Sequence, residues 1–311
     1  MIRVHDLSFT YPGNTEPTID RVGFSLEPGH IYGFLGPSGA GKSTTQRILY
    51  GLFPGYQGSA QVYDREIRDW STEIYARIGI GFETPNLYLK LTGRENLDLA
   101  LALRARRNSR ARSPDGIARH RAPNPNTCDI DTGLERLGLA SAANQQVEKW
   151  SKGMRMRLSF LRAVLHGPAL LFLDEPTSGL DPKWARVIKD WALELRRDGT
   201  AVFLTTHSME LADELCDTVG FLIDGHIAAE DAPMVLKQRH GRPAITVHGF
   251  DARDRHVTRT VPYEELRCGS LADVHRITRV VNHEVSLEEV FLRLTGRALT
   301  GQSPPEPSGT Q

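Results

Sequence analysis

The sequence is poor in cysteine and has no long apolar run. Among its 311 residues are three cysteines, Cys128, Cys216 and Cys268, which are far apart and odd in number. This pattern fits neither a disulfide framework nor a zinc site, so we expect reduced structural thiols. The longest apolar stretches, such as residues 169–173, have the length of a strand. A transmembrane helix needs roughly 20 apolar residues, so we expect no segment that crosses a bilayer.

The chain also lacks an excess of either charge and an apolar signal segment. Lys plus Arg and Asp plus Glu both number 38, so no overall field attracts nucleic acid, and we expect no nucleic-acid partner. The first residues, MIRVHDLSFTY, alternate like a strand and contain no signal core, which predicts a cytoplasmic protein. With 40% hydrophobic residues, the chain has enough apolar material for one large domain and a small additional one.

Short apolar strands alternate with amphipathic helical stretches from residue 1 to about residue 230. This alternation predicts an α/β domain with a mostly parallel sheet covered by helices. Residues 1–26 are expected to form an antiparallel β subdomain. The strands expected in the main sheet are residues 31–35, 78–82, 169–173 and 201–205, followed by a hairpin over residues 220–229 that turns at Asp224-Gly225.

A helical subdomain is predicted from about residue 85 to residue 166. Helical periodicity replaces the strand pattern there, notably over residues 94–104 and 151–165. Within it, residues 104–121 contain seven arginines and one acid, Asp115. Such a charge run is typical of a solvated loop, and a docking surface for membrane phosphates or an acidic partner is the alternative. Of the two, the sequence favours the loop.

A smaller C-terminal region follows from residue 231 to residue 300. After a short helix, the alternating stretches HVTRTV and ITRVV predict strands, and SLEEVFLRLTG predicts a final helix. We therefore expect an α+β accessory domain, whose role the sequence leaves open. The tail, residues 301–311, is rich in Pro, Ser and Gly and is expected to be disordered.

The segment GPSGAGKST has the pattern of a phosphate-binding loop, because it follows an expected strand and opens a helical stretch. Glycines in such a loop let backbone N–H groups turn towards phosphate oxygens, and the start of the helix adds a positive field. Lys42 is expected to contact the β- and γ-phosphates, and Ser43 to ligate Mg²⁺. The residues expected to hold ATP here are Gly36, Pro37, Ser38, Gly39, Ala40, Gly41, Lys42, Ser43 and Thr44.

The segment ALLFLDEP predicts a buried strand that ends in two carboxylates. Asp174 is placed to complete the metal site begun by Ser43. Glu175 is placed to orient the attacking water or to accept a proton from it. Two adjacent acids are common at strand ends, but together with a phosphate-binding loop they indicate a Mg²⁺-dependent ATPase.

Three further segments carry a resemblance to a known family. They are WSKGM at residues 150–154, SGLD at residues 178–181, and His207 after the strand AVFLTT. In this order they resemble the ATPases of ABC transporters, and the resemblance covers roughly residues 1 to 230. It implies a P-loop nucleotide-binding domain that acts as a homodimer or heterodimer. It also implies a separately encoded transmembrane permease that holds the protein at the inner face of the membrane.

The resemblance further implies roles for four residues outside the phosphate-binding loop. Ser151 and Gly153 match the signature positions that face the γ-phosphate of ATP held by the other subunit. Asp181 lies in the segment that matches the D-loop, which contacts the partner beside the catalytic water. His207 matches the switch histidine that contacts the γ-phosphate. The ordinary alternative is a helix N-cap for Ser151 and a structural or surface residue for His207.

Two more positions follow from the same resemblance. Tyr11, in LSFTYPG, matches the aromatic residue on which adenine stacks, and a simple strand-end tyrosine is the alternative. Glu83, in RIGIGFETPNLY, occupies the place where the family usually has the glutamine of the Q-loop. A carboxylate there is able to ligate Mg²⁺ and to link the nucleotide to the permease, whereas a neutral substitution fits equally well.

The stretch ETPNLYLKLTGRENL and the ending SLEEVFLRLTG resemble exporter subunits for bacitracin resistance, lantibiotic immunity and multidrug export. They predict export of drugs, antibiotics or lipid-like compounds, without naming the cargo. A soluble ABC ATPase for DNA or ribosomes is disfavoured, because the chain has one cassette and no sustained heptads between Glu83 and Ser151. A P-loop kinase or GTPase leaves WSKGM and His207 unexplained. A cassette without hydrolysis is disfavoured by the presence of both Glu175 and His207.

Overall fold

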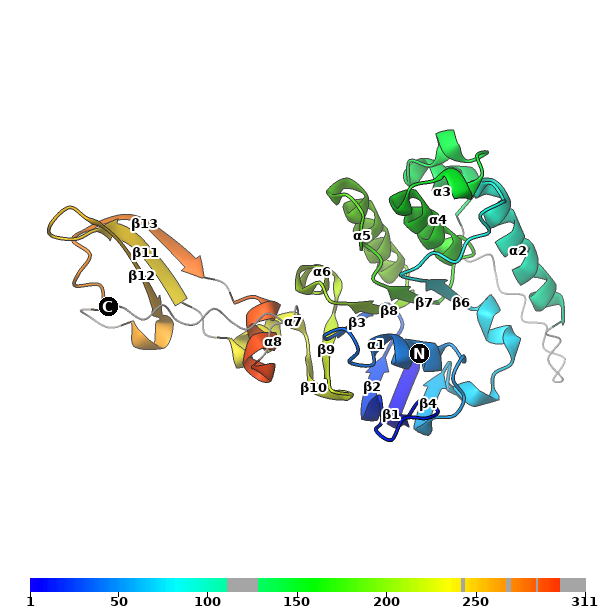
Figure 1. The fold of residues 1–311 in the computed structure, drawn as a ribbon, viewed down its shortest axis with the longest axis horizontal. Helices are drawn as coiled ribbons and strands as arrows, with labels where there is room; N and C mark the ends of the chain where they lie inside the picture. The colour runs from blue at the N-terminus through cyan, green and yellow to red at the C-terminus, as the bar shows by residue number, and fades with distance from the viewer. Residues whose placement is uncertain (111–127, 242–243, 267–269, 284, 297–311) are drawn as a thin grey trace. The chain divides into compact units, whose positions relative to one another are not determined.

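The computed structural model of the chain describes residues 1–110, 128–241, 244–266, 270–283 and 285–296. It divides into a larger unit, Met1–Glu230, and a smaller unit, Asp231–Gln311. In the larger unit, the central sheet lies between the antiparallel strands and the helices α2, α3 and α4 (Figure 1). Among the described residues, no helix combines the length and the apolarity that crossing a membrane requires.

The central sheet of the larger unit has six strands in the order β10-β9-β3-β8-β7-β6. The pairs β3–β8, β3–β9, β7–β8 and β6–β7 are all parallel, which confirms the predicted α/β sheet. Every residue of β3 and β8 is buried, as is usual for strands covered on both faces. The strands are β3 (Ile31–Leu35), β6 (Ile78–Gly81), β7 (Leu170–Asp174), β8 (Ala201–Thr206), β9 (Thr218–Ile223) and β10 (His226–Asp231).

The predicted hairpin at the end of the larger unit is also present. β9 and β10 are joined by Asp224-Gly225, whose φ angles are 46° and 82°. Two consecutive residues with positive φ match the right-handed twist of paired strands, and Asp-Gly is a favoured sequence for this turn.

A second, antiparallel sheet has the order β2-β1-β4-β5. Its strands are β1 (Ile2–Phe9), β2 (Ile19–Leu26), β4 (Gln57–Val62) and β5 (Arg65–Glu66). Residues of β1 and β2 alternate between buried and exposed, because one face packs on the core and the other faces solvent. Their antiparallel pairing confirms the expectation for residues 1–26.

Helices connect the strands of the larger unit, and several begin at a capping side chain. Asp129, Ser151, Asp181 and Ser208 each accept a hydrogen bond from a backbone N–H of the first helical turn. The helices are α1 (Lys42–Leu49), α2 (Gly93–Arg110), α3 (Ile130–Arg136), α4 (Lys152–Val164), α5 (Pro182–Arg197) and α6 (Met209–Leu215). Short 3₁₀ turns cover residues 67–69, 72–76, 140–142 and 147–149.

The arginine-rich segment is partly different from the prediction. α2 continues to Arg110, so residues 104–110 are helical, where the sequence favoured a solvated loop. Arginine has a high intrinsic helix propensity, which explains why a charge run can extend a helix. The remainder of the run, residues 111–121 with Asp115, lies outside the described residues. Cys128 and Cys216 are free thiols, and Cys268 lies outside the described residues too.

The smaller unit contains a three-stranded antiparallel sheet in the order β12-β11-β13, together with two helices. Its elements are α7 (Pro233–His240), β11 (Ala244–Phe250), β12 (His256–Pro262), a 3₁₀ turn at Tyr263–Glu265, β13 (Arg276–His283) and α8 (Leu287–Thr295). β12, β13 and α8 confirm the predicted strands and final helix. β11 was not predicted, although AITVHGF alternates in burial as a strand does. The tail over residues 301–311 lies outside the described residues.

Candidate functional site

The phosphate-binding loop joins the end of β3 to the start of α1. Gly39 and Gly41 have φ angles of 84° and 106°, which residues with side chains rarely adopt. A methyl group on Gly41 would also lie only 2.6 Å from Ile19 Cγ2. Both the turn and the close packing therefore require glycine at this position.

The side chain of Lys42 folds back over this loop. Its Nζ donates to the carbonyl oxygens of Gly36 at 2.6 Å and Pro37 at 3.0 Å. Burial lowers the pKa of the Lys42 ammonium. The negative charges of Glu175, Asp174 and Glu83 oppose this lowering but do not cancel it. All three carboxylates therefore lie within electrostatic reach of the lysine. The fold thus brings together residues that the sequence separates widely.

Ser43 and Asp174 come into contact across the site. Ser43 Oγ, at the start of α1, donates to Asp174 Oδ2 at 3.4 Å, and Thr205 Oγ1 donates to Asp174 Oδ1. A hydroxyl and a carboxylate are hard oxygen donors of the kind that Mg²⁺ prefers. The pair therefore fits the metal role expected for these two residues.

Glu175 is held in a strained and almost buried position. Its backbone φ is 47°, and only 9% of its surface is exposed. Oε1 accepts hydrogen bonds from the His207 backbone N–H at 2.8 Å and from the ring nitrogen Nδ1 at 2.6 Å. Thr206 Oγ1 donates to Oε2 at 3.0 Å. Backbone strain of this kind at a non-glycine residue is common at active sites and ligand-binding sites.

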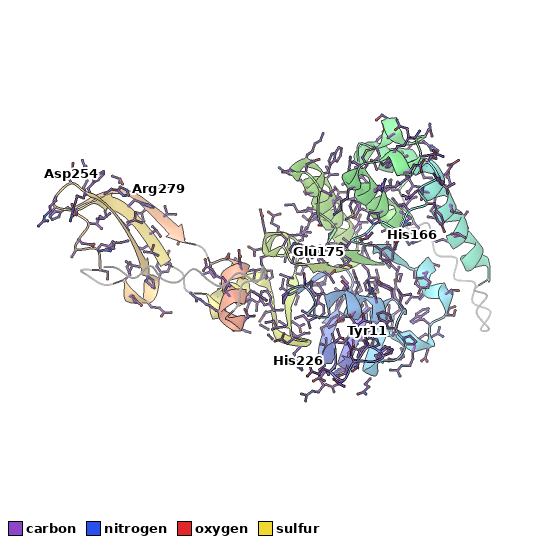
Figure 2. The ribbon with its side chains drawn as sticks, viewed as in Figure 1. Tyr11, His166, Glu175, His226, Asp254 and Arg279 are labelled. Carbon is purple, nitrogen blue, oxygen red and sulfur yellow. The ribbon has the colours of Figure 1, made fainter. Side chains whose placement is uncertain are left out.

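The Glu175 carboxylate is thus anchored by the carboxyl end of β8, next to the end of its own strand β7. The His207 side chain remains 63% exposed. It is therefore able to reach a ligand while it holds Glu175. Figure 2 shows Glu175 among the central strands of the larger unit.

Tyr11 follows β1, and its hydroxyl shares a hydrogen bond of 3.0 Å with Thr44 Oγ1 in α1. Its ring packs edge-on against Phe9 and Phe53, with centroids 5.0 and 5.6 Å apart. The tyrosine, labelled in Figure 2, is therefore tied by way of Thr44 to the phosphate-binding loop. The fold thus places the tyrosine that was expected to stack on adenine beside the phosphate-binding loop.

Ser151, Gly153 and Asp181 belong to a different part of the larger unit. Ser151 Oγ caps α4 by accepting from Met154 N at 3.2 Å, and Asp181 Oδ1 caps α5 by accepting from Trp184 N at 3.1 Å. Within the described residues, none of the three makes a hydrogen bond or ion pair with the phosphate-binding loop. The single chain therefore does not bring all the expected nucleotide-binding residues together.

Two threonines of the site, Thr205 and Thr206, were not predicted from the sequence. Thr205 and Thr206, at the end of β8, hold the carboxylates of Asp174 and Glu175 respectively. The sequence feature that could have pointed to them is the pair of threonines directly before His207 in AVFLTTH. Their partners could not be recognised, because they depend on the parallel pairing of β7 with β8, in which Asp174 lies opposite Thr205.

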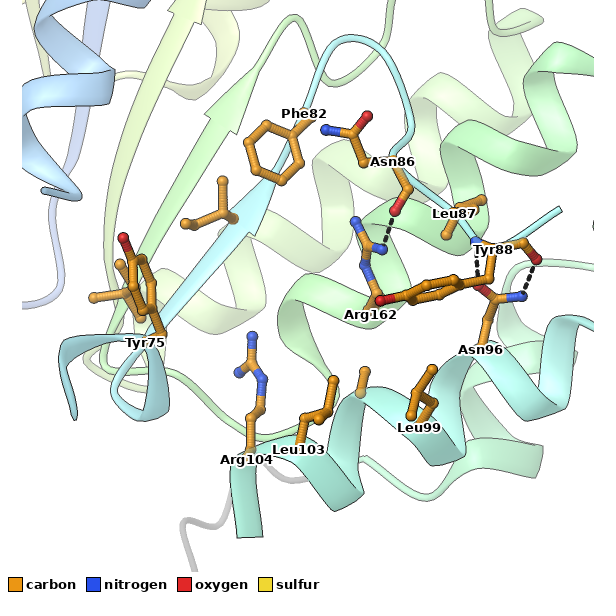
Figure 3. Close-up of a pocket in the computed structure, with 13 residues that line it drawn as sticks. Tyr75, Phe82, Asn86, Leu87, Tyr88, Asn96, Leu99, Leu103, Arg104 and Arg162 are labelled. Atoms are coloured by element: carbon orange, nitrogen blue, oxygen red, sulfur yellow. Dashed lines mark hydrogen bonds between the residues drawn. The ribbon is translucent and has the colours of Figure 1, made fainter. Parts of the chain in front are cut away.

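A groove of about 530 Å³ lies beside the segment that follows Glu83. Arg162 Nη1 donates to the carbonyl oxygen of Asn86, and Tyr88 exchanges backbone hydrogen bonds with the side chain of Asn96 (Figure 3). Burial lowers the pKa of the Arg162 guanidinium. The groove is lined by Tyr75, Ile78, Ile80, Phe82, Asn86, Leu87, Tyr88, Asn96, Leu99, Ala100, Leu103, Arg104 and Arg162.

Known proteins resemble both the sequence and the fold. The family model described as ABC transporter matches residues 19–178. The "Fluoroquinolones export ATP-binding protein" of Mycobacterium tuberculosis is 42% identical over 306 residues, covering 96% of this chain and 95% of that protein. The "Bacitracin transport ATP-binding protein" of Bacillus licheniformis is 29% identical, covering 97% of this chain and 99% of that protein.

Two solved structures extend this likeness to the fold. An "ATP binding subunit of ABC transporter" has a TM-score of 0.64 and 27% identity, covering 78% of this chain and 93% of that one. A dimeric ATP-binding cassette in a post-hydrolysis state, bound to ADP and Pi, has a TM-score of 0.61 and 25% identity. That match covers 75% of this chain and 98% of the other. Both likenesses support the α/β nucleotide-binding fold with its antiparallel and helical parts.

Proposed function

Since the chain belongs to the ABC transporter family, as a subunit of the kind that binds and hydrolyses ATP, we propose that two copies of it enclose ATP and Mg²⁺ and power a separate permease. The observation that carries this proposal is the cluster around Lys42. The phosphate-binding loop, the Ser43–Asp174 pair and Glu175 all meet at the carboxyl ends of β3, β7 and β8.

The residues of this cluster have different roles, which follow from their chemistry. Lys42 and the loop amides bind the phosphates and offset their charge. Ser43 and Asp174 would hold Mg²⁺, which supplies positive charge to the phosphate oxygens. Glu175 orients the attacking water or accepts its proton, and its hydrogen bonds to Thr206 and His207 fix the carboxylate for this task.

A second copy would complete each site. The N-terminus of α4 presents the Ser151 hydroxyl, which is able to donate while its oxygen caps the helix, together with backbone N–H groups at Ser151 and Gly153, and these donors suit the γ-phosphate of ATP held by the partner. A methyl group on Gly153 would make ordinary contacts within its own chain, the closest being Leu180 Cδ2 at 3.5 Å. The packing of the single chain therefore does not demand glycine here, whereas a close approach by a ligand does.

The permease would bind beside Glu83. This glutamate would then connect the permease to the nucleotide site. Tyr88, which lines the groove, and Leu89, which follows it in the chain, are large apolar side chains that remain exposed. Apolar residues around a groove suit an inserted segment of a protein partner. Such binding would hold the chain at the inner face of the membrane. By analogy with its named relatives, the complex would export drugs or antibiotics such as fluoroquinolones or bacitracin.

The test is to express the chain with the membrane protein encoded beside it. We expect the two to purify as one complex whose ATPase activity requires Mg²⁺ and whose expression lowers the accumulation of antibiotics such as fluoroquinolones or bacitracin in cells. The Glu175→Gln complex should assemble without lowering accumulation. Failure of the chain to associate with any membrane protein would contradict the permease proposal.

A further inference from the structure

The two helix starts that we propose to face the partner lie close together within one chain. α4 starts after Ser151, and α5 starts after Asp181. A methyl group on Gly179, in the loop before α5, would lie 3.7 Å from Cε of Lys152 in the first turn of α4. The signature turn, residues 151–153, and the D-loop, residues 178–181, are therefore neighbours.

A cation–π contact between a buried arginine and a partly buried tryptophan joins the helices behind these two segments. The guanidinium of Arg157 in α4 lies 4.1 Å from the centroid of the Trp184 ring in α5. Arg157 is only 8% exposed, and its Nε donates to the carbonyl oxygen of Gly153 at 3.3 Å. Trp184 in turn donates its backbone N–H to Asp181 Oδ1. Each partner of the contact is thus bonded to one of the two segments.

The turn after α3 fixes both partners. Arg157 Nη1 donates to the carbonyl oxygen of Leu137, and the Trp184 ring covers the neighbouring Gly138. A methyl group on Gly138 would lie only 2.2 Å from Trp184 Cη2, and its φ is 61°. Glycine is therefore required for the indole to approach this turn so closely. The arginine and the tryptophan have little freedom to move apart.

We propose that Trp184 is a positioning residue that acts through Arg157 to fix the signature turn to the D-loop. The two segments then meet the second copy as one preformed surface. This inference rests on the proposed dimer, in which both segments face the partner. The physical reason is that two separately mobile segments would each lose conformational entropy on association, whereas a fixed pair loses less.

A matched control lies on the same helix. Trp191 is seven residues, about two turns, beyond Trp184, and the Arg136 guanidinium lies 4.2 Å from its centroid. Trp191 is 5% exposed, so its loss should cost at least as much stability. This second cation–π contact joins α3 to α5 and involves neither the signature turn nor the D-loop.

The experiment compares full-length variants in the Glu175→Gln background with ATP and Mg²⁺. Sedimentation should show that Trp184→Leu raises the protein concentration for half-maximal dimerisation about tenfold, which corresponds to about 1.4 kcal/mol. Trp184→Phe retains an aromatic face and should dimerise almost like the parent, as should Trp191→Leu. The affinity of the monomer for ATP should be unchanged in all three. Equal losses in Trp184→Leu and Trp191→Leu would overturn the proposal.

Hydrogen exchange of the monomer separates this proposal from that of the dimer. If Trp184 positions both segments, Trp184→Leu should speed exchange in residues 151–156 as well as in residues 178–183. Faster exchange in the D-loop alone would overturn the positioning role. A parent protein that fails to dimerise would contradict the proposed dimer, and the exchange measurement would still decide the role of Trp184.

Discussion

The Glu175 carboxylate is bound through one oxygen to both the backbone and the ring of His207, at 2.8 and 2.6 Å. His207 is therefore part of the site itself, and not only the first residue after β8. It determines where the carboxylate points, and it leaves Oε2 to Thr206. This arrangement leads to separate expectations for the residues that bind nucleotide and those that act on water.

Replacement of Glu175 by glutamine should abolish turnover without abolishing nucleotide binding. The amide keeps the size of the side chain but cannot accept a proton, so we expect hydrolysis to fall by about 10²- to 10⁴-fold. ATP affinity should stay within about threefold of the parent, since the phosphate contacts come from the loop. Steady-state hydrolysis and equilibrium binding measure the two effects. The contrasting variant, Lys42→Ala, should lose ATP binding itself. A Glu175→Gln protein that fails to bind ATP would remove the glutamate from this role.

Removal of the Thr205 hydroxyl should weaken metal binding. Thr205→Val takes away the donor to Asp174 Oδ1, so the carboxylate is less well oriented for Mg²⁺. We expect the Mg²⁺ concentration for half-maximal hydrolysis to rise about fivefold. Thr200→Val is the control, because Thr200 is a buried threonine whose hydroxyl donates to the Pro168 carbonyl oxygen at 3.1 Å. The idea is wrong if both variants show the same Mg²⁺ dependence.

Loss of the Ser151 hydroxyl should impair association of two copies. Ser151→Ala in the Glu175→Gln background should weaken ATP-dependent dimerisation about tenfold, because a hydrogen bond to phosphate is lost. The variant also loses a helix cap, at a cost of about 1 kcal/mol in folding stability. Ser286→Ala removes an equivalent cap in α8, where Ser286 Oγ accepts from Glu289 N at 3.2 Å. Sedimentation with ATP compares them, and an equal effect of both variants would argue against a composite site.

Glu83 should link hydrolysis to transport. If it ligates Mg²⁺, Glu83→Gln keeps a neutral oxygen ligand and should preserve ATP affinity, whereas Glu83→Ala should slow hydrolysis. Transport per ATP hydrolysed should fall in both variants. Asp98→Asn, an exposed acid of α2, serves as the control. ATPase and transport rates of the reconstituted complex decide the matter, and parental values of both for Glu83→Ala would show a neutral surface position.

Sequence patterns determined the local features of this protein. The strands at residues 31–35 and 201–205, the Asp224-Gly225 turn and the phosphate-binding loop all follow from short-range rules: runs of buried apolar residues, favoured turn residues and fixed glycine spacing. The same rules missed β11, because its polar and apolar residues alternate only weakly. They also ended α2 too early, because its charged last turns show no periodic pattern of apolar residues.

Only the tertiary structure decided which of these features meet. The parallel register of β7 and β8 places Thr205 opposite Asp174, and the strained backbone at Glu175 turns its carboxylate towards His207. The contact between Arg157 and Trp184 likewise depends on the packing of two helices that the sequence treats separately. Such pairings depend on strand register and helix packing across distant segments, and no local spacing encodes them.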